Sequence, residues 1–204
     1  MKIDKKKFIY LISPNKIEGK FYQNLDKILK TGKIGLFQMR LKRYSLKKKI
    51  RIGKKIKTIC KKNSVKFLIN DDPVLAKKLN ADGCHLGQKD MNIIEAKKII
   101  PNKIIGITCH NSIRLAKKAI KNDASYLAFG AFFSTNTKKV KYKAKIKILN
   151  EAKKITKTPL VAIGGIDNTN YKKLLLNNSN FLAISGYIWN NKKYKPLETI
   201  KKII

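Results

Sequence analysis

Residues 66–90 read KFLINDDPVLAKKLNADGCHLGQKD, a stretch that predicts the fold of the whole chain. Its first apolar run stops at an acidic turn, 70–72. Pro73 then begins a helix, because its fixed φ and missing N–H suit a first helical turn. A second apolar run, 83–86, stops at another polar turn, 87–90. The stretch therefore predicts the order strand, acidic turn, short helix, strand and second acidic turn.

Acidic residues are scarce in this chain, and they gather in the same stretch. The chain has 12 Asp and Glu against 48 Lys and Arg, yet Asp71, Asp72, Asp82 and Asp90 all fall within it. Asp72 directly precedes Pro73, so we expect it to cap the helix. Asp71 and Asp90 follow two neighbouring strands and are expected to share a hard cation. A Mg²⁺ site of this kind uses one or two carboxylates, with waters and substrate phosphates completing the octahedron.

Apolar runs that look like strands recur from end to end of the chain, and Lys-rich segments with helical periodicity lie between them. The clearest of these segments follows Ser45, a good N-cap, and the pattern is repeated at Ile113, Ala116 and Ile120. The apolar stripe of the segment that follows Ser45 consists of Leu46, Ile50, Gly53, Ile56 and Cys60. The expected strands are 8–12, 35–40, 66–69, 83–86, 104–108, 126–129, 160–163 and 181–184.

Eight strand–helix units in 204 residues predict an α/β fold, a single small (β/α)₈ TIM barrel that spans residues 1–204. A domain of this length buries about 70% of its unfolded surface. The alternative is a doubly wound open sheet. That fold rarely needs eight units, and the G-x-G-x-x-G expected of it is missing from this sequence.

Composition argues against several classes of protein. No run approaches 18 apolar residues, so no transmembrane helix is expected, and the short apolar run 8–12 is interpreted as a first strand rather than a signal peptide. Cys60, Cys84 and Cys109 are odd in number and form no C-x-x-C, which argues against a disulfide framework or a zinc site. A reducing cytoplasm fits best, and the sequence leaves a homo-oligomer open.

The net charge of +36 has two interpretations. One is a protein that binds nucleic acid or an acidic membrane. The other is compositional bias, because Lys, Asn and Ile are all abundant and all have AT-rich codons. Lys is spread along every predicted helix without a single basic block, which favours bias. We therefore expect no specific nucleic-acid partner and no membrane partner, and salt should abolish any affinity for DNA.

A TIM barrel carries its chemistry where the strands end, at the carboxyl-terminal face. Polar residues follow the predicted strands at these positions. Alternation along the second strand puts Gln38, Arg40 and Lys42 on one side. The other strand ends are Asn70-Asp71, residues 87–90, Thr108-Cys109-His110, the loop 134–139, Gly164-Gly165-Ile166 and Ile184-Ser185-Gly186.

These residues suit electrostatic handling of phosphate or diphosphate groups more than proton transfer. Arg40 and Lys42 are either surface cations or, as their alternation with apolar neighbours favours, cations of the barrel mouth. Gly164-Gly165 is either a tight turn or a set of bare N–H groups for a phosphate. His85 lies inside a strand and is expected to be structural, and the role of His110 is open. The sequence suggests no Ser-His-Asp or Cys-His arrangement and no carboxylate pair acting as general acid and base.

The strand-end motifs resemble those of thiamine-phosphate synthases. The matching segments are QMRLK at 38–42, INDD at 69–72, DGCHLGQKD at 82–90, GITCH at 106–110, FGAFFSTNTK at 129–138, AIGGI at 162–166 and AISG at 183–186. They occur in the family's order over most of the chain, and the spacing from INDD to GQ-x-D is highly specific. The resemblance implies a (β/α)₈ transferase that joins hydroxymethylpyrimidine diphosphate to thiazole phosphate, or to its carboxylated form, and releases diphosphate.

The resemblance also implies roles for the matched residues. Arg40, Lys42, Thr108 and Lys138 would be catalytic, and Asp71 and Asp90 would bind Mg²⁺. The pyrimidine diphosphate would be held by Gln38, Met39, Arg40, Leu41, Lys42, Asn70, Thr108 and Lys138, and the thiazole phosphate by Thr135, Asn136, Thr137, Gly165, Ile184 and Ser185. The family reaction is thought to be dissociative: diphosphate leaves, and the thiazole nitrogen captures a pyrimidine-methyl cation without a protein base. Thr108 stands where the family usually has Ser, and Ser134 where it usually has Pro.

Two other functions compete with this one. The sister group, the thiazole tautomerases, shares the barrel but carries a catalytic His after the glycine that corresponds to Gly130, where this chain has Ala131. The sister group also tends to lose the Mg²⁺ and diphosphate residues, which this chain retains. The second competitor is a basic nucleic-acid-binding protein on an enzyme-derived scaffold. Such a protein would have no reason to keep the complete set of strand-end residues.

Overall fold

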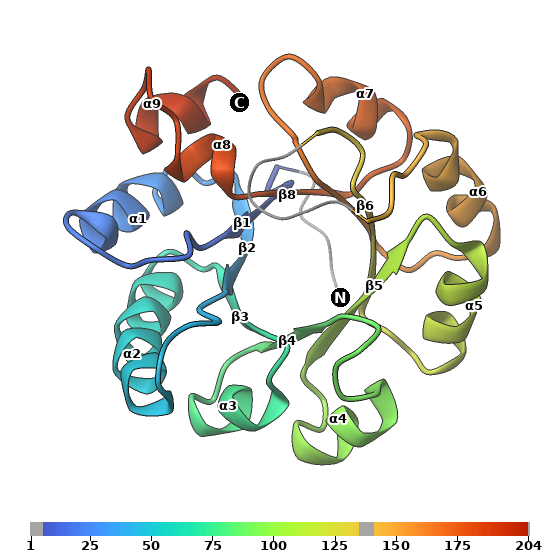
Figure 1. Cartoon of the computed structure of the whole chain (residues 1–204), viewed down its shortest axis with the longest axis horizontal. Coiled ribbons are helices and arrows are strands. Elements are labelled where there is room, and N and C mark those ends of the chain that lie inside the picture. The colour runs from blue at the N-terminus through green and yellow to red at the C-terminus, as the bar shows by residue number, and fades with distance from the viewer. Residues whose placement is uncertain (1–5, 135–140, 204) are drawn as a thin grey trace.

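A computed structural model describes residues 6–134 and 141–203, which form a closed barrel of parallel strands surrounded by helices (Figure 1). The strands follow chain order around the barrel, and the last pairs with the first. They are β1 (Ile9–Ile12), β2 (Ile34–Met39), β3 (Lys66–Asn70), β4 (Gly83–Leu86), β5 (Ile104–His110), β6 (Tyr126–Gly130), β7 (Leu160–Ile163) and β8 (Phe181–Ile184). The predicted TIM barrel is confirmed, and the bounds of every predicted strand agree to within two residues.

Helices cover the outside of the barrel. They are α1 (Phe21–Leu29), α2 (Leu46–Lys62), α3 (Pro73–Lys78), α4 (Ile93–Ile99), α5 (Ile113–Lys121), α6 (Lys147–Ile155), α7 (Tyr171–Leu176), α8 (Gly186–Trp189) and α9 (Pro196–Lys201). The sequence did not predict α9, which follows the eight strand–helix units and packs against α1 and α8 (Figure 1). Within residues 6–134 and 141–203, no helix is long and apolar enough to cross a membrane.

Two helices begin at side chains that the sequence identifies. The Asp72 carboxylate accepts a 2.8 Å hydrogen bond from the Leu75 N–H, so Asp72 caps α3 as predicted. The Ser45 hydroxyl accepts one of 3.4 Å from the Lys48 N–H at the start of α2. Such bonds satisfy N–H groups that have no partner within the helix. The role of Asp72 is therefore structural, as the N-cap of α3.

The apolar stripe predicted for α2 is only partly buried. Gly53, Ile56 and Cys60 are buried, but the Leu46 side chain is 48% exposed, and the buried face begins at Ile52 instead. Leu46 is the first residue of α2, so the exposed part of the predicted stripe is the amino-terminal end of the helix.

Two apolar layers stabilise the barrel. The inner layer fills the barrel itself and includes Tyr10, Leu36 and Tyr126. The outer layer lies between strands and helices and includes Phe37, which follows Leu36 along β2. This alternation reflects the two-residue period of a strand. The inner layer is unusual in containing two tyrosines, whose hydroxyl groups lie 2.8 Å apart.

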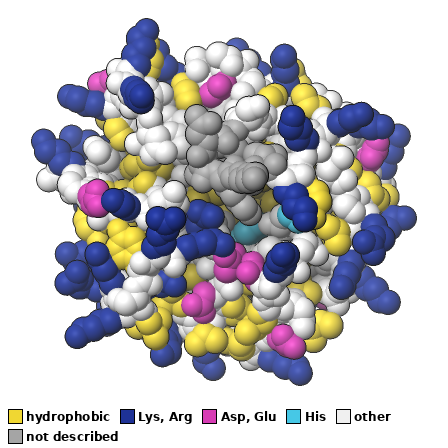
Figure 2. Space-filling view, in the orientation of Figure 1, with side chains coloured by type: hydrophobic (Ala, Val, Ile, Leu, Met, Phe, Trp, Pro, Cys, Tyr) yellow, Lys and Arg dark blue, Asp and Glu magenta, His cyan; other side chains and the backbone are white. Residues whose placement is uncertain are grey.

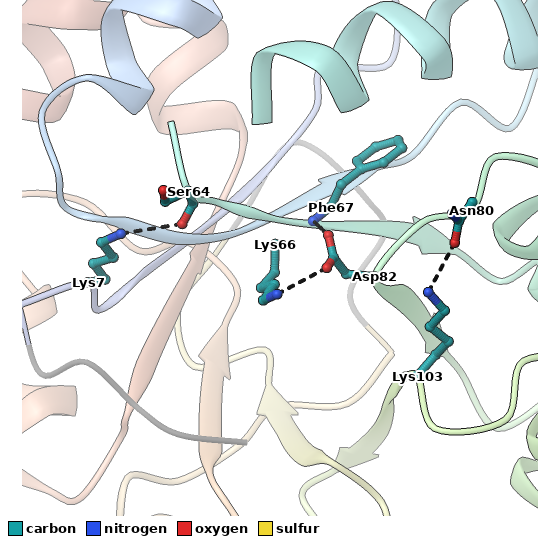
Figure 3. Close-up of polar contacts among 7 residues, drawn as sticks. All are labelled: Lys7, Ser64, Lys66, Phe67, Asn80, Asp82 and Lys103. Atoms are coloured by element: carbon teal, nitrogen blue, oxygen red, sulfur yellow. Dashed lines mark hydrogen bonds and ion pairs between the residues drawn. The ribbon is translucent and has the colours of Figure 1, made fainter. Parts of the chain in front are cut away.

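Asp82 belongs to the opposite end of the barrel from the strand ends that carry the candidate site. Its carboxylate accepts a 2.9 Å hydrogen bond from the Phe67 N–H and lies 3.2 Å from the Lys66 ammonium (Figure 3). Both partners are at the start of β3, and Asp82 itself directly precedes β4. One member of the predicted acidic cluster therefore stabilises the amino-terminal face, where TIM barrels carry no active site.

Gly106 leaves the space that the Tyr126 ring occupies inside the barrel. A Cβ at position 106 would stand 1.8 Å from Cζ of Tyr126. We expect Gly106→Ala to lower the free energy of unfolding by about 1–3 kcal/mol or more, because overpacking must displace a fully buried ring. Urea unfolding followed by circular dichroism measures this loss. A change below about 0.5 kcal/mol, the size usual for surface substitutions, would contradict the tight contact.

Candidate active site

The carboxyl-terminal ends of the strands bring the candidate residues to one face of the barrel. The chain has two histidines, and both belong to this end: His85 in β4, and His110 as the last residue of β5. Figure 2 shows histidine and acidic side chains near the middle of this face, with Lys and Arg spread around them. This is the face at which TIM-barrel enzymes place their chemistry.

Arg40 is held beyond β2 by two residues that follow β1. Its backbone N–H donates to the Ser13 hydroxyl at 2.9 Å, and its Nη1 donates to Oδ1 of Asn15 at 3.1 Å. Ser13 is buried, and its carbonyl accepts a 3.1 Å hydrogen bond from the Ser185 hydroxyl beyond β8. The sequence analysis missed Ser13 and Asn15. The signal was present, because Ser13-Pro14-Asn15 directly follows the first strand.

Asp71 and Asp90 come together as predicted, and Lys42 contacts the first of them. The Lys42 ammonium lies 2.9 Å from Oδ2 of Asp71. The Asp71 backbone is in the left-handed region, with φ 63°, and its N–H donates to the His85 carbonyl at 2.8 Å. Oδ2 of Asp90 accepts a 2.7 Å hydrogen bond from the Gly87 N–H, and the two carboxyl groups share a hydrogen-bond contact.

The pKa values of these two carboxyl groups move in opposite directions. Burial raises the pKa of Asp71, but hydrogen bonds with Lys42 and Asp90 and the Lys42 charge outweigh it, so that pKa lies below its ordinary value. Burial and the neighbouring Asp71 raise the pKa of Asp90, against a smaller effect of the Gly87 N–H. Two carboxyl groups in contact disfavour double ionisation, because like charges repel. A bound cation would remove that repulsion.

The Asp71–Asp90 pair fits the usual protein environment of Mg²⁺. This ion takes oxygen ligands, commonly one or two carboxylates, and keeps water and substrate phosphates in its remaining positions. Within residues 6–134 and 141–203, no group of three or more His, Cys, Asp or Glu is placed to hold a metal. The described residues thus offer two carboxylates to such an ion, and water and substrate would have to complete its coordination.

Thr108 and His85 lie at the inner side of the candidate site. Nε2 of His85 is 2.8 Å from Oγ1 of Thr108, and Nδ1 is 2.9 Å from the Tyr126 hydroxyl. Burial lowers the pKa of His85 to about 4, against the charge of Asp71. His85 is packed with both ring nitrogens engaged, as expected of a structural residue. The Thr108 carbonyl accepts a hydrogen bond from the Gln88 side chain, which ties β5 to the loop after β4.

The loop after β7 closely approaches the segment after β6. Gly164 and Gly165 both have positive φ, 103° and 63°, and a Cβ on Gly165 would stand 2.2 Å from the Ser134 carbonyl oxygen. The Gly165 carbonyl accepts a 2.9 Å hydrogen bond from the Asn170 side chain. Both glycines are therefore required by the backbone of this turn. Their predicted role in phosphate binding stays a prediction.

The predicted substrate-binding residues differ in what they can present to a ligand. Gln38 is only 3% exposed, and its amide Nε2 donates to the Tyr10 hydroxyl inside the barrel. Met39, Leu41 and Ile184 have side chains in the outer apolar layer, so only their backbone could contact a substrate. Asn70 ends β3 beside the metal candidates, and its side chain bonds to Asp71. Thr135, Asn136, Thr137 and Lys138 lie outside the described residues.

Comparisons with known proteins agree with this arrangement. Residues 9–188 match the family described as thiamine monophosphate synthase. A thiamine-phosphate synthase of Pelagibacter ubique is 68% identical over 199 residues, which cover 97% of this chain and 96% of the relative. One of Erythrobacter litoralis is 38% identical over 187 residues, or 89% of this chain and 88% of the relative.

A solved structure leads to the same family. The thiamine phosphate pyrophosphorylase of Pyrococcus furiosus is 27% identical, has a TM-score of 0.86, and covers 98% of this chain and 94% of its own. The match over residues 9–188, the identity to relatives over nearly their full length and the common barrel all agree. The chain belongs to the thiamine monophosphate synthase family.

Proposed function

We propose that this transferase makes thiamine phosphate from hydroxymethylpyrimidine diphosphate and thiazole phosphate, with Mg²⁺ held by Asp71 and Asp90. Thiamine-phosphate synthesis itself follows from membership of the family. The metal requirement and the roles of individual residues are the proposed part. In the reaction, the bond between the pyrimidine methylene carbon and the diphosphate oxygen breaks, and a bond from that carbon to the thiazole nitrogen forms. Diphosphate leaves with the electron pair of the broken bond.

The observation that carries the proposal is the contact of Lys42, Asp71 and Asp90 at the ends of β2, β3 and β4. The Lys42 ammonium lies 2.9 Å from Asp71, whose carboxyl group also contacts that of Asp90, so the site brings opposite charges together where a cation and an anionic substrate could bind. Both ring nitrogens of His85 already have hydrogen-bond partners, so this histidine has no free nitrogen to act as a base. A reaction driven by departure of an anionic leaving group needs charge neutralisation and no base.

Each group at the mouth has a task in this reaction. Arg40, preorganised by Ser13 and Asn15, binds the diphosphate, and Lys42 adds a second positive charge. Mg²⁺, when bound, would neutralise charge on the leaving diphosphate. Thr108 donates a hydrogen bond to the same group. The thiazole phosphate is assigned to the loops after β6, β7 and β8, at Thr135–Thr137, Gly165 and Ser185, because TIM barrels commonly bind phosphate there.

The experiment is a stoichiometric assay with both substrates and Mg²⁺. We expect thiamine phosphate and diphosphate to form in equal amounts, and neither to accumulate when the thiazole phosphate is omitted. A parallel reaction with the carboxylated thiazole phosphate reports which form is preferred. Isomerisation of a thiazole substrate without thiamine phosphate formation would point to the sister tautomerase activity instead. The cytoplasmic location stays a prediction from the sequence, which leaves a homo-oligomer open.

A further inference from the structure

A continuous line of hydrogen-bonded side chains crosses the inside of the barrel and ends at the candidate active site. Nε2 of Gln38 donates to the Tyr10 hydroxyl, which lies 2.8 Å from the Tyr126 hydroxyl. The Tyr126 hydroxyl lies 2.9 Å from Nδ1 of His85, and Nε2 of His85 lies 2.8 Å from Oγ1 of Thr108. These five residues, the interior chain, come from β2, β1, β6, β4 and β5 in that order.

The inner part of the interior chain is sealed from solvent. Gln38, Tyr10 and Tyr126 are 3%, 1% and 0% exposed. The Tyr10 and Tyr126 rings pack edge to face with centroids 5.7 Å apart, and the His85 ring stacks on Tyr126. Among the described residues, no buried side-chain nitrogen or oxygen lacks a hydrogen-bond partner. Since an orphaned buried donor costs about 1–3 kcal/mol, each hydrogen in the chain should have an acceptor.

That requirement fixes which group donates and which accepts in each hydrogen bond of the interior chain. The Gln38 amide is oriented with Nε2 toward Tyr10, so the Tyr10 oxygen accepts from it, and the Tyr10 hydrogen goes to the Tyr126 oxygen. The Tyr126 hydrogen then goes to Nδ1 of His85, so the imidazole hydrogen is on Nε2 and is donated to Thr108. If Nδ1 carried a hydrogen, the Tyr126 oxygen would accept hydrogen bonds from both Tyr10 and His85. The hydrogen of the Tyr126 hydroxyl would then have no acceptor within the interior chain.

The direction decides what Thr108 can offer to a ligand. Its oxygen accepts from His85, so its own hydrogen is left for an acceptor on the mouth side, where the residue is partly exposed. Thr108 stands at the end of β5, next to the β4 loop that carries Asp90 and is tied to Thr108 through Gln88. Under the proposed function, the anionic group bound there is the diphosphate. A hydroxyl aimed at an anionic oxygen strengthens its bond as charge develops.

We propose that Gln38, Tyr10, Tyr126 and His85 are positioning residues that hold the Thr108 hydroxyl as a hydrogen-bond donor to the leaving diphosphate. This proposal rests on the proposed function for the identity of the ligand, but the direction of the interior chain is a property of the protein alone. It can therefore be tested in the absence of substrate.

The first test is ¹⁵N NMR of protein labelled at its histidines, without substrate. We expect His85 to be neutral with its hydrogen on Nε2, and a His110→Gln variant assigns the two histidine signals. A hydrogen on Nδ1, or on both nitrogens, overturns the proposal. This result does not depend on whether the protein makes thiamine phosphate, so it separates the proposal from the proposed function.

The second test compares two isosteric variants of the same ring pair. Tyr126→Phe removes the donor to Nδ1, so we expect the His85 tautomers to mix and kcat to fall on the order of tenfold, as loss of one well-aligned hydrogen bond predicts. Tyr10→Phe deletes a hydroxyl buried to the same degree but keeps the Tyr126 donor. The His85 tautomer should then persist, and kcat should fall less. Equal loss of kcat and an unchanged His85 signal in both variants would mean a purely structural role and overturn the proposal.

Discussion

Thiamine phosphate formation by this protein is expected to stop when a chelator removes divalent metal and to return when Mg²⁺ is added. The expectation comes from the contact between Asp71 and Asp90, in a chain that has 12 acidic residues against 48 basic ones. Two unit charges 4 Å apart repel by about 4 kcal/mol at an effective dielectric of 20. The single charge of Lys42 offsets one carboxylate, so without a divalent cation the other would still repel the diphosphate. A divalent ion reverses the sign of both interactions.

The variants Asp71→Asn and Asp90→Asn locate the effect. Each should raise the Mg²⁺ concentration needed for half-maximal rate at least on the order of 10- to 100-fold, the range found when even outer partners of a metal site are removed. The requirement should also grow as pH falls, because the raised pKa of Asp90 lets protons compete with the metal there first. The Asp90→Asn variant should lose that part of the pH dependence.

A matched control comes from the opposite end of the barrel. Asp82→Asn changes an aspartate that bonds to Phe67 and Lys66, so it should affect stability without altering the Mg²⁺ requirement. Urea unfolding of all three variants separates a folding defect from a metal defect. Full activity of the Asp90→Asn protein at trace Mg²⁺ would show that the metal site is elsewhere.

The second large effect is expected at Arg40. Its guanidinium is fixed by Asn15 and its backbone by Ser13, so it is in place before the substrate arrives. A preorganised cation binds the diphosphate in the ground state and the transition state alike, which affects KM rather than kcat. We expect Arg40→Ala to raise KM for the pyrimidine diphosphate and so to lower kcat/KM roughly 30- to 900-fold. This loss corresponds to about 2–4 kcal/mol of binding free energy.

Arg43→Ala is the control, because it removes the same charge from an exposed position three residues away. Steady-state kinetics should show little change in that variant. A comparable rise in KM for both variants would mean that Arg40 acts only through the general positive charge of the protein. Lys138→Ala, whose effect follows from the sequence alone, should lower kcat instead. Equal effects on KM alone from Arg40→Ala and Lys138→Ala would contradict this division of roles.

The sequence by itself determined the barrel, because the signals that carry it are local. Runs such as Gly83–Leu86 have the apolar pattern of a strand, and Asp72-Pro73 predicts the start of a helix. Each strand–helix unit can therefore be predicted from a few neighbouring residues. It also predicted that Asp71 and Asp90 would meet, since both follow strands of one parallel sheet. Topology alone brings the ends of such strands to one face.

Only the tertiary structure separated the roles of the four clustered aspartates and brought the five residues of the interior chain into contact. Asp71, Asp72, Asp82 and Asp90 look alike in the sequence, but one caps a helix and one bonds to the start of β3 at the far end of the barrel. Gln38 and Thr108 are linked through Tyr10, Tyr126 and His85, which come from three other strands. Such contacts depend on the register of non-neighbouring strands and on the closure of the barrel. The local sequence pattern predicts which side of a strand a residue occupies. It does not predict which residues of different strands face one another, because strand register and barrel closure decide that.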